Sequence, residues 1–155
     1  MFQVTPLPTA VVLTALARLA EGDPTVQRRT VTAPLSAPCR HCLRDGEPGE
    51  AMLLFAHTPF DRRTPYTETG PVFAHERCKA AVLGRGVLPP VTHARGQVML
   101  RAYGVDGAIH TGRIVETSAL ADVLQSLFAL PEIAYAHVRS ASNGCFTYRV
   151  DRAGA

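Results

Sequence analysis

The chain has 155 residues, 46% of them apolar and 19% charged, and its sixteen basic and thirteen acidic residues leave a net charge of +3. A chain of this length and composition buries one hydrophobic core, so we expect a single domain spanning residues 1–155. These values exclude collagen-like, coiled-coil and strongly disordered proteins. Every long apolar stretch is interrupted by charge or proline, which excludes a membrane-spanning helix.

The N-terminal segment lacks the pattern of a secretory signal. No Lys or Arg precedes the apolar stretch Ala10–Ala17, and Pro6 and Pro8 interrupt its approach, whereas a signal peptide starts basic and continues with a longer apolar run. We therefore expect a cytoplasmic, reducing location, where cysteines are metal ligands or free thiols rather than disulfides. The basic residues are scattered along the chain, which argues against nucleic-acid binding. A nucleic-acid-associated protein is the alternative, and it predicts binding that depends strongly on salt.

The first predicted element is a helix over about residues 10–20. Apolar residues recur there at helical spacing, Thr9 can cap the first turn through its hydroxyl, and Gly22 ends the helix. Val26–Thr32 is a predicted strand, and the continuous apolar run Ala51–Ala56 suits a strand that is covered on both faces.

A long loop, Thr58–Gly70, separates that run from the next predicted strand, Val72–His75. Loops of this length are uncommon in compact domains and often carry function. The segment Lys79–Ala94 is expected to be irregular, because it contains two glycines and a pair of prolines.

The remaining chain predicts two hairpins with a helix between them. Gln97–Tyr103 and Ala108–Glu116 form the first hairpin, and Ser118–Leu130 forms an amphipathic helix. Ile133–Arg139 and Cys145–Val150 form the C-terminal hairpin.

Strands outnumber helices and hairpins dominate, so the predicted fold class is α+β, with a mainly antiparallel sheet and two principal helices in a single domain. In this organisation the helix at about 10–20 precedes the sheet and cysteine-bearing segment 26–116. The helix at about 118–130 and the C-terminal hairpin 133–150 follow.

Four residues have a spacing that suits one zinc ion. Cys39 and Cys42 form a C-x-x-C pair, and His75 and Cys78 form an H-x-x-C pair. Together they offer three thiolates and one imidazole, a ligand set that zinc favours in a tetrahedron. His41, next to Cys42, is a competing ligand. If zinc binds, protein ligands fill all four positions, so the ion would be structural.

Two other interpretations of these residues stay open. The three thiols could be small buried side chains beside an ordinary surface histidine. The Cys39/Cys42 pair could be redox-active, although it lacks the βαβ context of a thioredoxin-like motif.

A second group of candidate residues lies on predicted neighbouring strands. Side chains alternate along a strand, so His137 and Arg139 share one face with Ile133, and Arg101 and Tyr103 share a face of their own strand. If the strands pair, the arginines could hold a carboxylate or phosphate in two bonds. The candidate ligand-binding residues are Arg101, Tyr103, His137, Arg139, Asn143 and Cys145.

Several stretches of the chain together resemble a bacterial family catalogued as domain of unknown function 1203. The resemblance covers about residues 28–152 and implies a single-domain, cytoplasmic bacterial protein, without implying a reaction, cofactor or substrate. It includes the stretches around Cys39, His75, Arg101, His137, Arg139 and Cys145. The matching stretches are Pro38–Arg40, Leu43–Glu50, Met52–Leu54, Thr64–Tyr66, Gly70–His75, Leu100–Tyr103, His137–Arg139 and Asn143–Phe146.

The sequence thus predicts a domain that binds a small anionic ligand or a protein partner through the polar sheet face and the Thr58–Gly70 loop, with a structural zinc site. The alternative is an enzyme that uses Cys145 or His137 beside an arginine-lined pocket. An exposed polar face without a ligand is the simplest competing interpretation. Whether the cysteine cluster and the arginine face form one site stays open.

Overall fold

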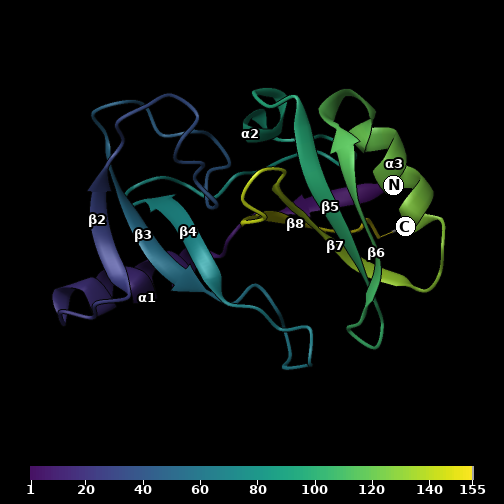
Figure 1. Cartoon of the computed structure of the whole chain (residues 1–155), viewed down its shortest axis with the longest axis horizontal. Coiled ribbons are helices and arrows are strands. Elements are labelled where there is room, and N and C mark those ends of the chain that lie inside the picture. The colour runs from purple at the N-terminus through teal and green to yellow at the C-terminus, as the bar shows by residue number, and fades with distance from the viewer. Residues whose placement is uncertain (155) are drawn as a thin grey trace.

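Two antiparallel sheets stand side by side in the computed structural model of the chain, which describes residues 1–154 (Figure 1). The smaller sheet has the order β2 (Val26–Thr30), β3 (Ala51–His57) and β4 (Gly70–His75). The larger sheet has the order β1 (Phe2–Thr5), β8 (Phe146–Arg152), β7 (Ile133–Ser140), β5 (Gln97–Gly104) and β6 (Ile109–Glu116). The α+β class with antiparallel pairing is confirmed, although the strands form two sheets.

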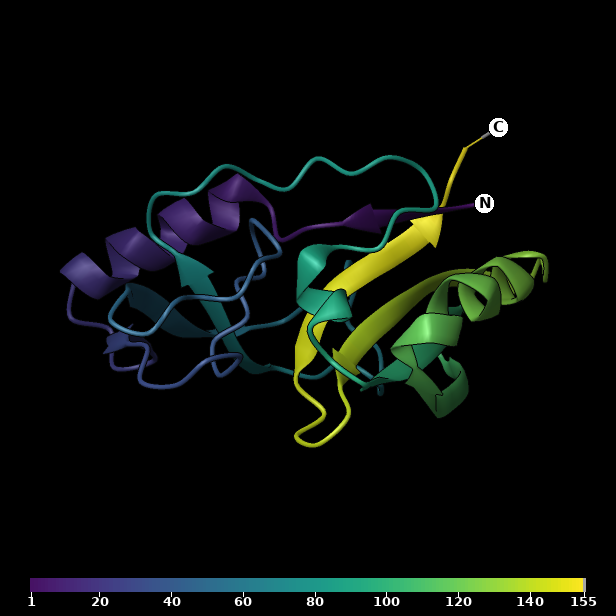
Figure 2. The same ribbon diagram turned by 90° about the horizontal axis from the view of Figure 1, so that it is seen from above.

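Each sheet is covered by one of the two principal helices. Figure 2 shows α1 (Thr9–Ala20) over the smaller sheet and α3 (Leu120–Phe128) against the larger one, with both chain ends on the same side. The helices bury apolar stripes in two separate clusters, one around α1 and one around α3. A single short helix, α2 (Pro90–His93), interrupts the segment that was expected to be irregular.

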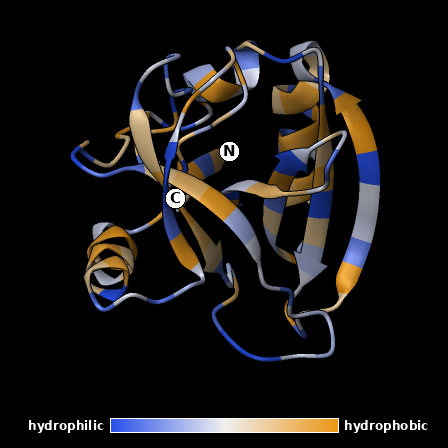
Figure 3. Cartoon of the chain, turned by 60° about the vertical axis from the view of Figure 1, so that its left-hand side comes forward, coloured by the Kyte–Doolittle hydropathy of each residue, from blue (hydrophilic) through white to orange (hydrophobic). Residues whose placement is uncertain are grey.

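Hydrophobic residues are frequent in the strands and helices, whereas the loop between β3 and β4 is mostly hydrophilic (Figure 3). The strands of the larger sheet bury alternate residues against α3, for example Val98, Leu100 and Ala102 of β5. The other face of this sheet is directed towards the loop between β3 and β4, and it carries the second group of candidate residues. No helix within residues 1–154 is long and apolar enough to cross a bilayer.

The structure corrects the expected role of Thr9. The N-cap of α1 is Pro8, and within residues 1–154 no side-chain hydrogen bond caps the helix. The Thr9 hydroxyl instead lies 2.9 Å from Nε2 of His41. The first turn of α1 is therefore tied to the cysteine-bearing loop rather than closed by its own side chain.

Three further features differ from expectation: a helix boundary, an additional strand and the face on which Ile133 lies. The helix predicted at 118–130 begins with a 3-10 turn, Thr117–Ala119, and is α-helical only over α3. Strand β1 was not predicted; it is four residues long and lies at the sheet edge beside β8. Ile133 was expected on the face of His137 and Arg139, but it packs with the α3 cluster. The register between β5 and β7 shifts near Gly104, which reverses the alternation at Ile133.

Candidate metal centre and ligand-binding face

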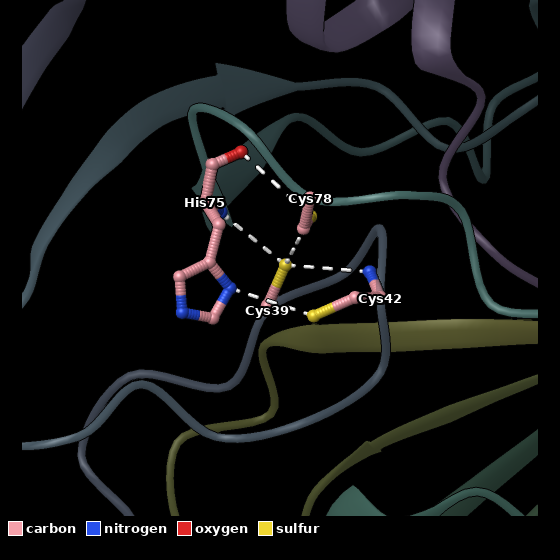
Figure 4. A group of neighbouring side chains, drawn as sticks. All are labelled: Cys39, Cys42, His75 and Cys78. Atoms are coloured by element: carbon pink, nitrogen blue, oxygen red, sulfur yellow. Dashed lines mark hydrogen bonds between the residues drawn. The ribbon is translucent and has the colours of Figure 1, made fainter.

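Cys39, Cys42, His75 and Cys78 meet where the loop after β2 lies against the end of β4 (Figure 4). Cys39 forms an isolated parallel bridge with Phe73 of β4, and the N–H of Arg40 donates to the Phe73 carbonyl at 2.9 Å. This pairing fixes the C-x-x-C segment beside His75, which ends the strand. Backbone hydrogen bonds therefore bring the C-x-x-C pair and the H-x-x-C pair together.

The four potential ligand atoms all lie within 4.8 Å of one another. The sulfurs of Cys39 and Cys78 are 3.8 Å apart, and the Cys42 sulfur is 3.4 Å from Nδ1 of His75. A zinc tetrahedron with bonds of about 2.3 Å to sulfur and about 2.0 Å to nitrogen has edges of about 3.8 Å and about 3.5 Å. Both separations match the edges of such a site, and all four cysteines of the chain are free thiols.

The sulfur atoms are also surrounded by hydrogen-bond donors. The backbone N–H groups of Cys42 and His75 donate to the Cys39 sulfur at 3.4 and 3.3 Å. Nδ1 of buried His41 lies 3.1 Å from the Cys78 sulfur. His41 is outside the group of four and orients Cys78, with its other ring nitrogen held by Thr9.

Without a cation, the three clustered thiols differ in how readily they ionise. Hydrogen bonds from the Cys42 side chain and from backbone amides lower the pKa of Cys39. The same contact with Cys39, together with burial, raises the pKa of Cys42 to about 12, and burial raises that of Cys78. A bound divalent ion would lower the pKa of all three thiols, because a coordinating thiol loses its proton.

Glu50 orients the histidine from outside the centre. Its carboxylate lies 3.1 Å from Nε2 of His75, so Nδ1 faces the sulfurs. The carboxylate is itself held by the Glu47 backbone amide, which lowers the pKa of Glu50, with His75 as a further cause. Carboxylates in this position fix the tautomer and ring orientation of a metal-binding histidine.

Glu50→Gln should therefore lower zinc affinity about tenfold, because the amide orients the imidazole less strongly than the carboxylate does. Competition with a chromophoric chelator measures this affinity. Glu21→Gln is the matched control, since this exposed carboxylate is remote in sequence and its side chain forms no hydrogen bond or ion pair within residues 1–154. Equal affinities for the Glu50→Gln variant and the wild type would contradict the orienting role.

Arg40 places a buried positive charge next to the centre. Its side chain donates to the carbonyl oxygens of Phe146 at 2.8 Å and Pro38 at 2.6 Å. Among residues 1–154 no carboxylate forms an ion pair with it. Burial lowers the pKa of Arg40 to about 10, while Cys145 and Cys39 favour its charged form.

The predicted ligand-binding residues fall on the face of the larger sheet that is opposite α3. Arg101 pairs with His137 across β5 and β7, and Tyr103 pairs with Tyr135. The strands are neighbours, as the prediction required, and Arg139 follows on the same face. Arg139 and His137 are buried and Arg101 is one-fifth exposed, so this face is not an open polar surface.

The Thr58–Gly70 loop covers this face. Glu68 forms ion pairs with both Arg101 and Arg139, the latter at 3.1 Å. The ring of Phe60 lies 5.1 Å from the His137 ring and 5.5 Å from that of Tyr103, between ring centres. The arginines thus already hold a carboxylate, and it comes from the chain itself.

Asn143 and Cys145 lie in the turn between β7 and β8. Gly144 between them has a φ of 71°, which explains the Asn-Gly pair in this turn. The Cys145 sulfur approaches the Asn143 carbonyl at 3.9 Å, and within residues 1–154 it forms no hydrogen bond to His137. Both turn residues line a cavity of about 190 Å³ beside Arg139 and another of about 790 Å³ beside Arg40.

Sequence reasoning did not identify Glu50, Arg40, Phe60 or Glu68. The long loop was singled out by its length, but nothing in its composition distinguishes Glu68 from the other charged residues. The two groups of candidate residues are linked through Phe146, whose carbonyl accepts from Arg40 and whose ring lies 4.9 Å from that of His137.

Comparison with known proteins agrees with the resemblance seen in the sequence. No curated protein and no solved structure matches the chain. A family model described as Protein of unknown function (DUF1203) matches residues 36–152, which include both groups of candidate residues. The chain therefore belongs to the DUF1203 family.

Proposed function

We propose that the protein is a ligand-binding domain in which Cys39, Cys42, His75 and Cys78 hold a structural zinc ion. The observation that carries the zinc site is the clustering of four ligand atoms within 4.8 Å, at separations close to tetrahedral edges. Because four protein ligands complete the coordination, the ion would stabilise the loop after β2 against the end of β4.

The charge of the surroundings supports this proposal. Zinc with three thiolates and a neutral imidazole carries a net charge of about −1. Arg40, buried and without a carboxylate partner in residues 1–154, supplies the opposite charge from within the C-x-x-C segment. A buried guanidinium is costly without an anionic neighbour. Cys39 is among the groups that favour the charged form of Arg40, and a zinc–thiolate group that includes Cys39 would add to this effect.

Metal analysis of the purified, tag-free protein tests the zinc site. We expect about one zinc per chain, and a chelator should expose the three thiols that the centre contains. Cys145 is the internal reference, because its thiol should react equally with and without metal. Metal-free protein whose four thiols all react while it is folded would refute the zinc site.

The ligand site of this proposal is the face formed by Arg101 and Arg139. Its support is the ion pairing of both guanidinium groups with the single carboxylate of Glu68. Two arginines converging on one carboxylate match the requirement for a small carboxylate or phosphate ligand. Replacing Arg139 by Met should abolish binding of such anions, as measured by titration calorimetry.

A further inference from the structure

The covering loop presents two different chemical groups to the arginine face. At one position Glu68 places a carboxylate on Arg101 and Arg139. At another, Phe60 places an aromatic ring edge-on against Tyr103 and His137. The surface beneath the loop therefore accommodates a carboxylate and an aromatic ring together.

The same face contains polar atoms that the loop does not satisfy. Within residues 1–154, the buried side-chain polar atoms without a hydrogen-bond partner are the Tyr103 hydroxyl, both ring nitrogens of His137 and Nε of Arg139. All belong to the adjacent strands β5 and β7. Buried polar groups are normally paired, so four unpaired atoms at one place indicate that a bonding partner belongs there.

Space for that partner adjoins the ion pair. The cavity of about 190 Å³ is bounded by Glu68 and Arg139 on one side and by Pro59, Cys145 and Phe146 on the other. Phe60 lies outside this lining, against Tyr103 and His137, so movement of the loop would uncover those two side chains beside the cavity. The aromatic side chains around His137 favour an apolar, planar group over a second charge.

We propose that this face binds a small aromatic carboxylate, whose place is taken by Phe60 and Glu68 in the ligand-free protein. The inference rests on the anion site of the proposed function and adds the ligand class and the role of the loop. The ligand carboxylate replaces Glu68 on Arg101 and Arg139, and its ring replaces Phe60. A polar substituent on the ring can then satisfy His137 or Tyr103.

Titration calorimetry of the zinc-loaded protein with 3-phenylpropanoate, acetate and inorganic phosphate tests this inference. Glu68→Ala removes the competing carboxylate, so it should bind 3-phenylpropanoate at least about tenfold more tightly than the wild type does. It should bind acetate about tenfold more weakly than 3-phenylpropanoate, because acetate has no ring to bury. Glu21→Ala, which removes an exposed charge elsewhere, should behave as the wild type.

Each other outcome overturns a defined part of the account. Equal affinity of Glu68→Ala for acetate, phosphate and 3-phenylpropanoate would overturn the aromatic ligand class while leaving the anion site. Equal affinity of Glu68→Ala and wild type would overturn the role of Glu68 as a competitor. If neither binds any of the three anions, the anion site of the proposed function is wrong as well. Glu68→Gln, which keeps the side-chain shape, replaces Glu68→Ala should the latter not fold.

Discussion

Cys39→Ser is expected to abolish stoichiometric zinc binding and to lower the free energy of unfolding by several kcal/mol. Cys39 is fully buried, and its sulfur accepts two backbone hydrogen bonds while lying 3.8 Å from the Cys78 sulfur. Structural zinc contributes its binding free energy to folding, about 10–16 kcal/mol in zinc-finger peptides at pH 7. Metal analysis together with urea denaturation followed by circular dichroism measures both effects.

Cys145→Ser is the matched control for this prediction. It makes the same chemical change at a thiol outside the cluster, so zinc content and stability should stay close to wild-type values. Adding excess chelator should lower the stability of the wild type and of Cys145→Ser, and leave that of Cys39→Ser nearly unchanged. If Cys39→Ser retains one tightly bound zinc, the assignment of ligands is wrong.

His137→Leu is expected to make the fold less sensitive to acid. Burial lowers the pKa of His137 to about 2, with further lowering by the positive charges of Arg139, Arg149 and Arg101. Below its ordinary pKa of about 6.5 the unfolded chain takes up a proton that the folded chain excludes. The free energy of unfolding therefore falls as the pH falls from about 6.5 towards 2.

The size of this effect follows from proton linkage. One such group costs about 1.4 kcal/mol per pH unit, so the wild type should lose roughly 2–3 kcal/mol more than His137→Leu between pH 6.5 and pH 4.5. Burial also lowers the pKa of His41 and of His57, but both residues remain in the variant. Comparing the two proteins thus isolates the contribution of His137.

Urea denaturation at several pH values between 4.5 and 7.5 measures the difference. His110→Leu serves as the control, because His110 is exposed on β6 and its removal should leave the slope unchanged. Parallel pH profiles for the wild type and His137→Leu would show that His137 accepts a proton in the folded state. The loop would then have to open to admit water or a counter-ion.

The two hairpins and the first helix could be predicted from the sequence because hydrophobic spacing and turn residues are local patterns. Both hairpins on β5–β6 and β7–β8 were identified from alternation and turn residues, and α1 from its helical spacing. β1 could not be found in this way, since four edge residues give too short a pattern. The division into two sheets depends on which strands pair at long range, and no local pattern encodes that choice.

The candidate sites show the same limit. Ligand chemistry and spacing singled out four residues that the structure brings together as a candidate metal centre. The residues that support the centre, Glu50 and Arg40, act from separate segments and leave no such signature. The arginine face and the Thr58–Gly70 loop were both expected to take part in binding, but the cover of the face by Phe60 and Glu68 is a tertiary contact across more than thirty residues of sequence.

X-ray absorption at the zinc edge of the purified protein tests the central claim most directly. The ligand set predicts a shell of three sulfur atoms at about 2.3 Å and one nitrogen at about 2.0–2.1 Å, with the outer-shell scattering of an imidazole ring. In Cys39→Ser this spectrum should be lost. A shell made only of nitrogen and oxygen atoms would contradict the Cys3His centre.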